Sequence, residues 1–376
     1  MKTLFITGIT GSIGTQALDV LNTLNDSINL IGGSVNSNWR KLKIIIEKYG
    51  LKYAALAKPS NEVPNFYKGC KIFKGDNSTE NAIEKANADI SLIATSGAAG
   101  LAHTIQASKY SKRIALANKE SLVLGGDLIL NLFKKNGNEL IPVDSEHSAI
   151  FQLVLGENSI DEIYLTASGG SLRDKQPFEL KNITKEQVLN HPTWSMGKRI
   201  TVDSASMVNK ILEVIEAYYL FNTNKIKIFI NRNSHIHSMV KFKDGVIKMH
   251  FGKPNMKVPI AYAFTYPDRL YEYEIPDIIN TEINFEEPDI QKYPVLKNLD
   301  RILGNHSLHI ALNASDEVAV DYFLKGNIKY LDINKTINYV INEIEKKQIN
   351  IKNFQDIFNL DNECRKIAEE FIKEEL

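Results

Sequence analysis

The first 144 residues alternate short apolar runs with amphipathic helical patterns, and this alternation restricts the fold more than any other feature of the chain. Lys2 to Thr7 has the length and composition of a buried strand, and a helix with one apolar face follows. Further strands are predicted at residues 28–33, 53–57, 88–95, 113–117 and 139–143, and helices at 40–49, 79–87, 100–109 and 121–135. Such alternation is typical of an α/β fold, and we expect a Rossmann-like doubly wound parallel sheet.

A glycine-rich turn, Gly8 to Gly14, lies between the first strand and the first helix. Glycines at such a turn let the backbone approach a pyrophosphate, and the N-terminus of the helix attracts its negative charge. The position therefore predicts a dinucleotide-binding site. The alternative is a tight turn between strand and helix that binds no ligand.

The end of the second predicted strand indicates which dinucleotide is bound. NAD-binding proteins usually place a carboxylate there, which holds a ribose hydroxyl. Residues 34–41 contain no carboxylate and provide hydroxyl groups, amide groups and the cations Arg40 and Lys41. We therefore expect NADPH, with the alternative that the two cations belong only to a solvated helix start.

The pattern changes after residue 144. Strands are predicted at 161–167, 225–230 and 239–251 and a helix at 205–221, which favours an α+β domain with a mixed sheet. Residues 271–290 contain seven acidic residues, no basic residue and two prolines, as an extended linker would. Helices are predicted at 294–303, 307–323, 332–345 and 353–373. We expect an NADPH-binding domain at 1–144, a catalytic domain at 145–270, a linker at 271–293 and a helical domain at 294–376.

The bulk composition excludes several classes of partner. The chain has 376 residues, with 45 basic and 45 acidic ones, so its net charge is zero. A neutral chain is not typical of proteins that bind nucleic acid or membrane surfaces. No apolar run approaches the ~20 residues of a membrane span, and the first strand begins too early to leave room for a signal peptide. We expect a cytoplasmic protein with Cys70 and Cys364 as free thiols.

Three carboxylates suggest a metal site. Asp144 and Glu146 stand two residues apart at the end of a predicted strand, and Glu213 lies on the helix predicted at 205–221. Side chains two residues apart point to the same side of a strand, and ligands bind at the carboxyl ends of strands in doubly wound sheets. Carboxylate oxygens are the ligands that Mg²⁺ and Mn²⁺ prefer. The alternative for the first pair is two solvated loop carboxylates.

The helix predicted at 205–221 carries polar groups beside its apolar stripe. Asp203 or Ser204 is expected to be its N-cap. Asn209, Lys210 and Glu213 have the spacing of neighbours on one helix face. They form either a solvated face with an ion pair or a site that binds an anionic substrate and completes the metal site.

Residues 191–197 read His-Pro-Thr-Trp-Ser-Met-Gly. Trp194 and Met196 are costly to expose in a loop, which predicts a lid that closes over a substrate and excludes water. The alternative is a loop packed on the core. Residues 166–170, at the end of a predicted strand, form a further candidate anion-binding turn.

Two histidine pairs have the spacing of metal ligands, His235 with His237 and His306 with His309. The first pair has no carboxylate beside it in its predicted strand, and the second lies on a predicted helix. We expect both to be structural.

Eight segments of the chain together resemble the family of 1-deoxy-D-xylulose 5-phosphate reductoisomerases, NADPH-dependent enzymes of the non-mevalonate isoprenoid pathway. The segments are Gly8–Gly14, Ala117–Ser121, Val143–Ile150, Ser168–Gly170, His191–Gly197, Val202–Glu213, His237–Val240 and Leu312–Glu317. The resemblance runs nearly from end to end, and the Asp-Ser-Glu-His and His-Pro-x-Trp-Ser-Met-Gly stretches are highly specific in combination.

The resemblance implies roles for particular residues. The matches to the metal ligands are Asp144, Glu146 and Glu213. The matches to the substrate site are Lys119, Ser145, Glu146, Ser168, His191, Trp194, Met196, Ser204, Asn209, Lys210 and Glu213. The matches to the cofactor site are Thr10, Gly11, Ser12, Ile13, Ser37, Asn38, Asn118, Glu120, Gly197 and Met256. The resemblance further implies Lys119, Glu146 and His191 as catalytic groups, and a homodimer.

The chemistry implied by the resemblance is a metal-assisted rearrangement of the substrate to an aldehyde, which NADPH then reduces to 2-C-methyl-D-erythritol 4-phosphate. One alternative is a metal-assisted NADP dehydrogenase or lyase that acts on another phosphorylated hydroxyketone. A second is a non-catalytic NADPH-binding regulator, which has no need of three metal-binding carboxylates.

Overall fold

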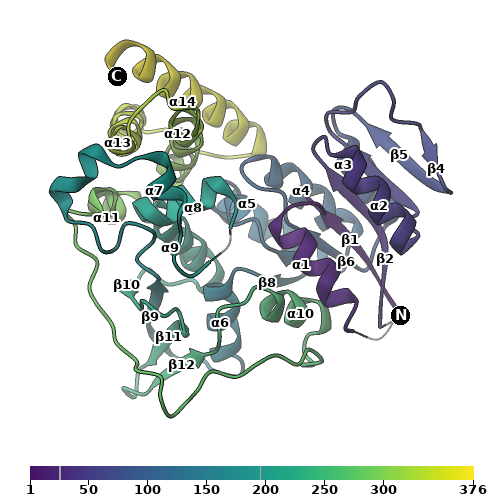
Figure 1. The fold of residues 1–376 in the computed structure, drawn as a ribbon, viewed down its shortest axis with the longest axis horizontal. Coiled ribbons are helices and arrows are strands. Elements are labelled where there is room, and N and C mark those ends of the chain that lie inside the picture. Colours follow the sequence, from purple (N-terminus) through teal and green to yellow (C-terminus); the bar gives the residue numbers. More distant parts are fainter. Residues whose placement is uncertain (25–26, 195) are drawn as a thin grey trace. The chain divides into compact units, whose positions relative to one another are not determined.

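The computed structural model describes residues 1–24, 27–194 and 196–376. Contacts within the chain divide it into two compact units. Unit 1 comprises residues 1–121, 129–148 and 255–274, and unit 2 comprises residues 122–128, 149–254 and 275–376. The elements of both units are labelled in Figure 1. The division into domains at residues 144, 270 and 293 stays a prediction.

Unit 1 is built on an eight-stranded sheet with the strand order β4-β5-β3-β2-β1-β6-β7-β8. All neighbouring strands are parallel except β4 and β5, which are antiparallel. The strands are β1 (Lys2–Thr7), β2 (Ile28–Val35), β3 (Tyr53–Leu56), β4 (Phe66–Tyr67), β5 (Cys70–Lys74), β6 (Ile90–Ile93), β7 (Arg113–Leu116) and β8 (Glu139–Pro142). The predicted doubly wound parallel sheet is confirmed.

The helices of unit 1 lie close to their predicted positions, except that α10 was not predicted. They are α1 (Ser12–Leu21), α2 (Trp39–Tyr49), α3 (Ser78–Ala86), α4 (Ala99–Tyr110) and α10 (Lys257–Thr265). The long helix α5 (Glu120–Asn136) begins in unit 1 and includes the unit 2 residues 122–128. Leu4, Phe5 and Ile6 of β1 are fully buried, as expected for a central strand covered on both faces.

Unit 2 contains a four-stranded sheet with the order β10-β9-β11-β12. Its strands are β9 (Ile160–Ala167), β10 (Ile226–Ile230), β11 (Ile236–Phe242) and β12 (Ile247–Phe251). β9 and β10 are parallel, whereas β11 is antiparallel to both β9 and β12, so the sheet is mixed as predicted. The single strand predicted at 239–251 is wrong, because a turn at residues 243–246 folds β12 back onto β11.

The helix predicted at 205–221 is two helices, α8 (Lys198–Ser206) and α9 (Val208–Phe221). Met207 separates them in a left-handed conformation, with φ 67°, which costs about 1–2 kcal/mol in a residue with a side chain. Asp203 and Ser204 lie inside α8, so the prediction that one of them caps the helix is wrong. Val214 and Ala217 of α9 pack with Ile163 and other apolar residues of the sheet.

The remaining elements of unit 2 are helical. They are η1 (Pro177–Asn182), α7 (Lys185–Leu189), η2 (Pro294–Asn298), α11 (Leu299–Ile302), α12 (His306–Lys325), α13 (Tyr330–Lys347) and α14 (Phe354–Glu375), and α6 (Ser145–Leu153) begins in unit 1 and ends in unit 2. α12 packs against α13 and α14. The predicted helical C-terminal region is confirmed.

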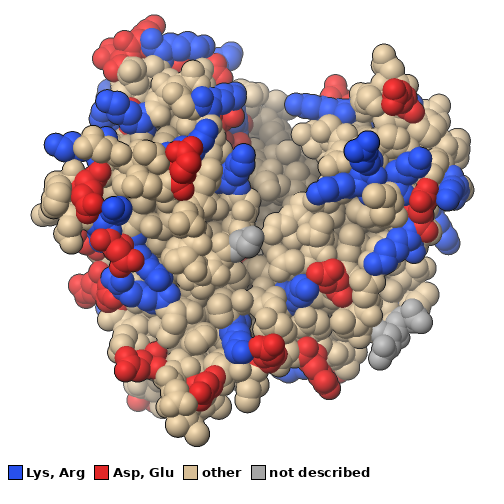
Figure 2. Space-filling model, viewed as in Figure 1, with Lys and Arg blue, Asp and Glu red and all other residues tan. Residues whose placement is uncertain are grey.

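No helix among the described residues has both the length and the apolar character needed to cross a membrane. The cytoplasmic location stays a prediction. Both basic and acidic side chains are scattered over the face drawn in Figure 2, in agreement with the net charge of zero.

Candidate active site

The turn after β1 is packed too closely for side chains at Gly8 and Gly14. Gly8 has φ +64°, and a Cβ atom there would lie 2.6 Å from the carbonyl oxygen of Ala94. A Cβ atom on Gly14 would lie 2.5 Å from the oxygen of Gly8. α1 begins at Ser12, and its N-cap residue, Gly11, has no side chain with which to cap the first turn. Amides at a helix N-terminus without a capping side chain suit a pyrophosphate, which supports the predicted contacts of residues 10–13.

The region predicted to hold a 2′-phosphate is exposed. Ser37 and Asn38 lie at the surface between β2 and α2, and Arg40 and Lys41 follow on the first turn of the helix. The side-chain oxygen of Asn38 accepts a hydrogen bond from the amide of Lys41 at 3.0 Å and so caps α2. Because this oxygen is used, the amide NH₂ group is left to donate. The donors and cations suit a phosphate.

Other residues predicted to contact the cofactor hold the loop after β6. The side chain of Asn118 donates to the carbonyl oxygen of Gly97 at 3.1 Å, and the amide of Gly97 donates to Glu120 at 3.0 Å. Gly197 and Met256 are the N-cap residues of α8 and α10. The structure therefore gives Asn118 and Glu120 a positioning role in the loop, while direct contact with a cofactor stays a prediction.

Asp144 lies between a strand and a helix. β8 ends at Pro142 and α6 begins at Ser145, so Glu146 lies in the first turn of a helix. The prediction that Asp144 and Glu146 extend from one face of a strand is therefore wrong, although both are near the carboxyl end of β8. The Asp144 carboxylate accepts from the amide of Glu146 at 3.4 Å, and the Ser145 hydroxyl donates to Glu146 at 2.5 Å.

Two basic groups face Asp144 within unit 1. The Nζ atom of Lys119 lies 2.7 Å from its carboxylate, and Nδ1 of His147 lies 3.4 Å away. Burial would raise the pKa of Asp144, but Lys119 and His147 outweigh it and hold that pKa well below its usual value. Asp144 is therefore a carboxylate, the form that binds a cation.

In unit 2 the polar face of α9 surrounds Glu213. The side-chain amide of Asn209 donates to its carboxylate at 2.5 Å, and Lys210 forms an ion pair with it. Lys210 also donates to the carbonyl oxygen of Thr166 at 2.5 Å. Lys210 is 4% and Glu213 1% exposed, so the solvated-face alternative is wrong.

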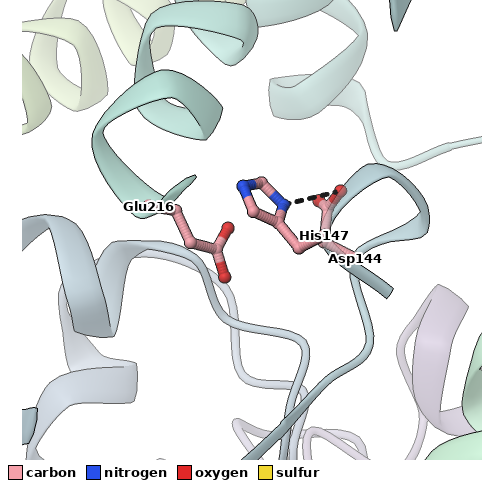
Figure 3. Close-up of side chains that lie close together, drawn as sticks. All are labelled: Asp144, His147 and Glu216. Atoms are coloured by element: carbon pink, nitrogen blue, oxygen red, sulfur yellow. Dashed lines mark ion pairs between the residues drawn. The ribbon is translucent and has the colours of Figure 1, made fainter. Parts of the chain in front are cut away.

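Two groups of side chains among the described residues could hold a metal ion, one consisting of Asp144, Glu146 and Glu213, the other of Asp144, His147 and Glu216. The first is the predicted set. Figure 3 shows the second, with the ion pair between Asp144 and His147 dashed. Sequence reasoning missed His147 and Glu216, although Glu216 follows Glu213 by three residues and so shares its side of the helix.

The turn after β9 presents a hydroxyl group. Nδ1 of His191 accepts from the amides of Thr193 and Trp194 at 3.1 and 2.9 Å. The single proton of a neutral imidazole is therefore on Nε2, which donates to the Ser168 hydroxyl oxygen at 3.0 Å. The amide of Gly170 donates to the same oxygen at 3.1 Å. With two donors on its oxygen, the Ser168 hydroxyl is left to donate its own proton to an anion.

Burial and the nearby Arg173 lower the pKa of His191 to about 4, so the ring is neutral at pH 7. Ser204 lies close to the same turn, since a Cβ atom on Gly170 would lie 2.6 Å from its carbonyl oxygen. Trp194 and Met196 are half-buried in the loop before α8, and Ser195 of the same motif lies outside the described residues. The structure thus places Ser168, His191 and Ser204 around the turn that follows β9.

The two histidine pairs fall outside both candidate metal groups of the described chain. The ring of His237 lies 5.6 Å from that of His250, and burial lowers its pKa to about 4. His306 pairs with the carbonyl oxygen of Leu124 at 2.6 Å. These contacts support the structural role predicted for both pairs.

Comparisons with known proteins point to one family along nearly the whole chain. Models of the 1-deoxy-D-xylulose 5-phosphate reductoisomerase family match residues 4–126, and models of its C-terminal domains match residues 140–221 and 251–367. The enzyme of this name from Thermotoga neapolitana is 41% identical over 372 residues, which are 98% of this chain and 96% of the relative. That of Thermodesulfovibrio yellowstonii is 41% identical over 384 residues and the full length of both chains.

Solved structures of the same family have the same fold. A DOX-P reductoisomerase in complex with NADPH, fosmidomycin and magnesium has a TM-score of 0.92 and 32% identity, covering 99% of this chain and 98% of its own. The Zymomonas mobilis enzyme in complex with NADPH has a TM-score of 0.86 and 32% identity over the full length of both chains.

Proposed function

Because the chain belongs to the 1-deoxy-D-xylulose 5-phosphate reductoisomerase family, we propose that it converts 1-deoxy-D-xylulose 5-phosphate to 2-C-methyl-D-erythritol 4-phosphate in isoprenoid precursor synthesis. It is an NADPH- and divalent-metal-dependent oxidoreductase, with Mg²⁺ or Mn²⁺ as the metal. Relatives of the same fold hold NADPH and magnesium. The observation that carries the proposal is the set of carboxylates Asp144, Glu146 and Glu213, accompanied by two lysines and a glycine turn for the cofactor.

The three carboxylates would hold the metal through hard oxygen ligands. A metal bound there supplies Lewis-acid polarisation of the substrate carbonyl, and NADPH supplies the hydride. In the structure Lys119 pairs with Asp144, so its ammonium group is placed to donate a proton or a hydrogen bond to a substrate oxygen beside the metal ligands. Glu146, at the start of α6, is the nearby group that can carry a proton.

The substrate phosphate would bind in unit 2. Ser168 offers a hydroxyl whose proton is free to donate, because His191 and Gly170 already occupy its oxygen. Lys210 offers a positive charge and Asn209 and Ser204 offer neutral donors, in keeping with their predicted roles. His191 acts through Ser168, so its contribution is to fix the direction of that hydroxyl. Binding of the remote phosphate orients the reacting carbons.

Trp194 and Met196 lie in the loop that ends at Gly197, just before α8. Their apolar side chains would cover the bound substrate and exclude water. Ser145 stays a predicted substrate contact, and its present partner is Glu146.

The test is NADPH absorbance loss with 1-deoxy-D-xylulose 5-phosphate, before and after chelation and with Mg²⁺ or Mn²⁺ restored. We expect metal-dependent oxidation that Glu213→Gln removes. Glu216→Gln is the matched control, because it changes the fully buried acid of the other candidate metal group. If Glu216→Gln lost the metal-dependent oxidation and Glu213→Gln kept it, the metal would be assigned to the second group. No oxidation with any metal, in protein that binds NADPH, would refute the function.

We also propose a homodimer formed through β12. This strand is at the edge of its sheet, with β11 as its single neighbouring strand in the described part of the chain, and an edge strand can pair with a second chain. Val246, just before the strand, is 51% exposed, and Ile247 and Met249 within it are each 45% exposed. Light scattering of the wild type and of Ile247→Lys tests this, and a wild-type monomer at micromolar concentration would refute it.

A further inference from the structure

Three side chains of unit 1 form a row that the metal and substrate sites do not use. His103 of α4 lies between Thr95, two residues beyond β6, and Glu80, in the first turn of α3. Its Nδ1 atom is 3.0 Å from the Thr95 hydroxyl, and its Nε2 atom is 3.7 Å from the Glu80 carboxylate. The side chains of His103 and Glu80 are 13% and 21% exposed, so solvent competes little for these contacts.

The charges around the ring decide where its proton lies. Burial lowers the pKa of His103 and Glu80 opposes that shift with a smaller effect, so the imidazole is neutral at pH 7. A neutral imidazole carries one proton. The Glu80 carboxylate attracts that proton to Nε2, which leaves Nδ1 as an acceptor. The Thr95 hydroxyl therefore donates to His103, and its oxygen lone pairs remain for another partner.

The strand order places Thr95 where a dinucleotide is expected. β2, β3 and β5 extend from β1 in one direction, and β6, β7 and β8 extend in the other. The order in which strands are added to the sheet thus reverses between β1 and β6, and nucleotides bind at the carboxyl ends of the strands at such a point. Thr95 follows β6 at this end.

Contacts hold the two strand ends together. The hydroxyl of Thr7, the last residue of β1, accepts from the amides of Ala94 and Thr95 at 2.9 and 3.2 Å. Gly8, the next residue, approaches the Ala94 carbonyl so closely that a Cβ atom would lie 2.6 Å from it. Thr95 therefore stands across from the glycine turn proposed to hold the pyrophosphate, and it is only half-buried.

We propose that Thr95 accepts a hydrogen bond from a ribose hydroxyl of the bound dinucleotide, and that His103 and Glu80 are positioning residues that fix the Thr95 hydroxyl for this contact. The inference rests on the proposed NADPH-dependent function. A ribose hydroxyl is the favoured partner because it can donate a proton, whereas a phosphate oxygen would meet the lone pairs of Thr95 and be repelled.

The test is the dissociation constant of NADPH, measured by its fluorescence in full-length protein without metal or substrate. Thr95→Val keeps the shape and removes the hydroxyl, and we expect binding about fivefold weaker, the effect of one neutral hydrogen bond. Thr95→Ser restores the hydroxyl and should bind like the wild type. Ser96→Ala removes an exposed hydroxyl from the same loop and is the matched control.

A double-mutant comparison separates positioning from a general effect on folding. His103→Gln should weaken NADPH binding about threefold in the wild type and have no further effect in Thr95→Val, because it acts through the missing hydroxyl. If His103→Gln weakened NADPH binding equally in the wild type and in Thr95→Val, the positioning role of His103 would be overturned. Unchanged NADPH binding by Thr95→Val would overturn the ribose contact. Failure of the wild type to bind NADPH at all would instead refute the proposed function.

Discussion

The ion pair between Lys119 and Asp144 leads to a prediction about metal affinity. The two charges are 2.7 Å apart, and the side chains are 7% and 13% exposed. At that distance and an effective dielectric constant of ~20, the attraction is about 6 kcal/mol. A divalent cation that uses Asp144 as a ligand must displace this contact, and it then sits beside a positive charge. Lys119 therefore opposes metal binding even as it serves the reaction.

We predict that Lys119→Met tightens metal binding and abolishes turnover. Recovery of only a quarter of the pair energy, ~1.5 kcal/mol, corresponds to a tenfold lower dissociation constant. Turnover should fall by at least ~10²-fold, the contribution typical of a positioned proton donor. Mn²⁺ binding is measured by electron paramagnetic resonance on metal-free protein, and turnover by NADPH oxidation at saturating Mn²⁺.

Lys257→Met is the matched control for the change in net charge. Lys257 also belongs to unit 1 and pairs with Asp19 at 2.8 Å, but the two side chains are 31% and 57% exposed. It should leave the Mn²⁺ dissociation constant unchanged. If Lys119→Met weakened Mn²⁺ binding, or matched the control, the reasoning that Lys119 competes with the metal would be wrong.

Three further predictions concern the turn, the phosphate site and the base of the lid. Gly14→Ala should destabilise the protein by ~1–3 kcal/mol in urea unfolding and weaken NADPH binding, because its Cβ would lie 2.5 Å from a backbone oxygen, although alanine usually stabilises a helix by ~1 kcal/mol over glycine. The pKa of His191 is about 4 when folded, below the ~6.5 of an unfolded histidine, so the unfolded state binds more protons between these values and stability rises with pH across that window; His191→Asn should flatten the rise in unfolding midpoint between pH 4.5 and 6.5. Arg199 on α8, the helix that follows the proposed lid, pairs with Glu317 on α12 at 2.9 Å. Arg199→Gln should therefore raise KM for the substrate more than it lowers kcat, whereas Arg301→Gln, a matched change on α11, should change neither. Equal effects of the two variants would contradict a role for Arg199 in supporting the lid.

The parallel sheet could be predicted because its strands are covered on both faces. Such strands read as continuous apolar runs, and helices between them show a clear 3.6-residue period. The predicted helices α2 to α5 end within one residue of the observed ones. The β4–β5 hairpin was missed, since β4 has only two residues and the alternation in β5 is short.

The wrong predictions arose where a local pattern was extended past the point at which a helix or strand ends. The apolar pattern on either side of Met207 continues, so one helix was predicted where the left-handed residue separates two. Strand geometry was likewise applied to Asp144 and Glu146, beyond the predicted strand end at residue 143, although α6 begins at Ser145. Asp144 and Glu146 still belong to one candidate metal group, because both the predicted strand geometry and the observed helix start keep them at the carboxyl end of β8.

The sequence by itself determined the central parallel strands and the helices α1 to α5 of the first 144 residues, and that Asn209, Lys210 and Glu213 share one face of a helix. These are local properties, set by side-chain period and by the geometry of a single helix. Only the tertiary structure decided the proton position on His191, because that depends on backbone amides and on Ser168, 23 residues away. It also decided the pairing of Lys119 with Asp144 and the row of Glu80, His103 and Thr95, since contacts between separate elements arise only when the strands and helices pack.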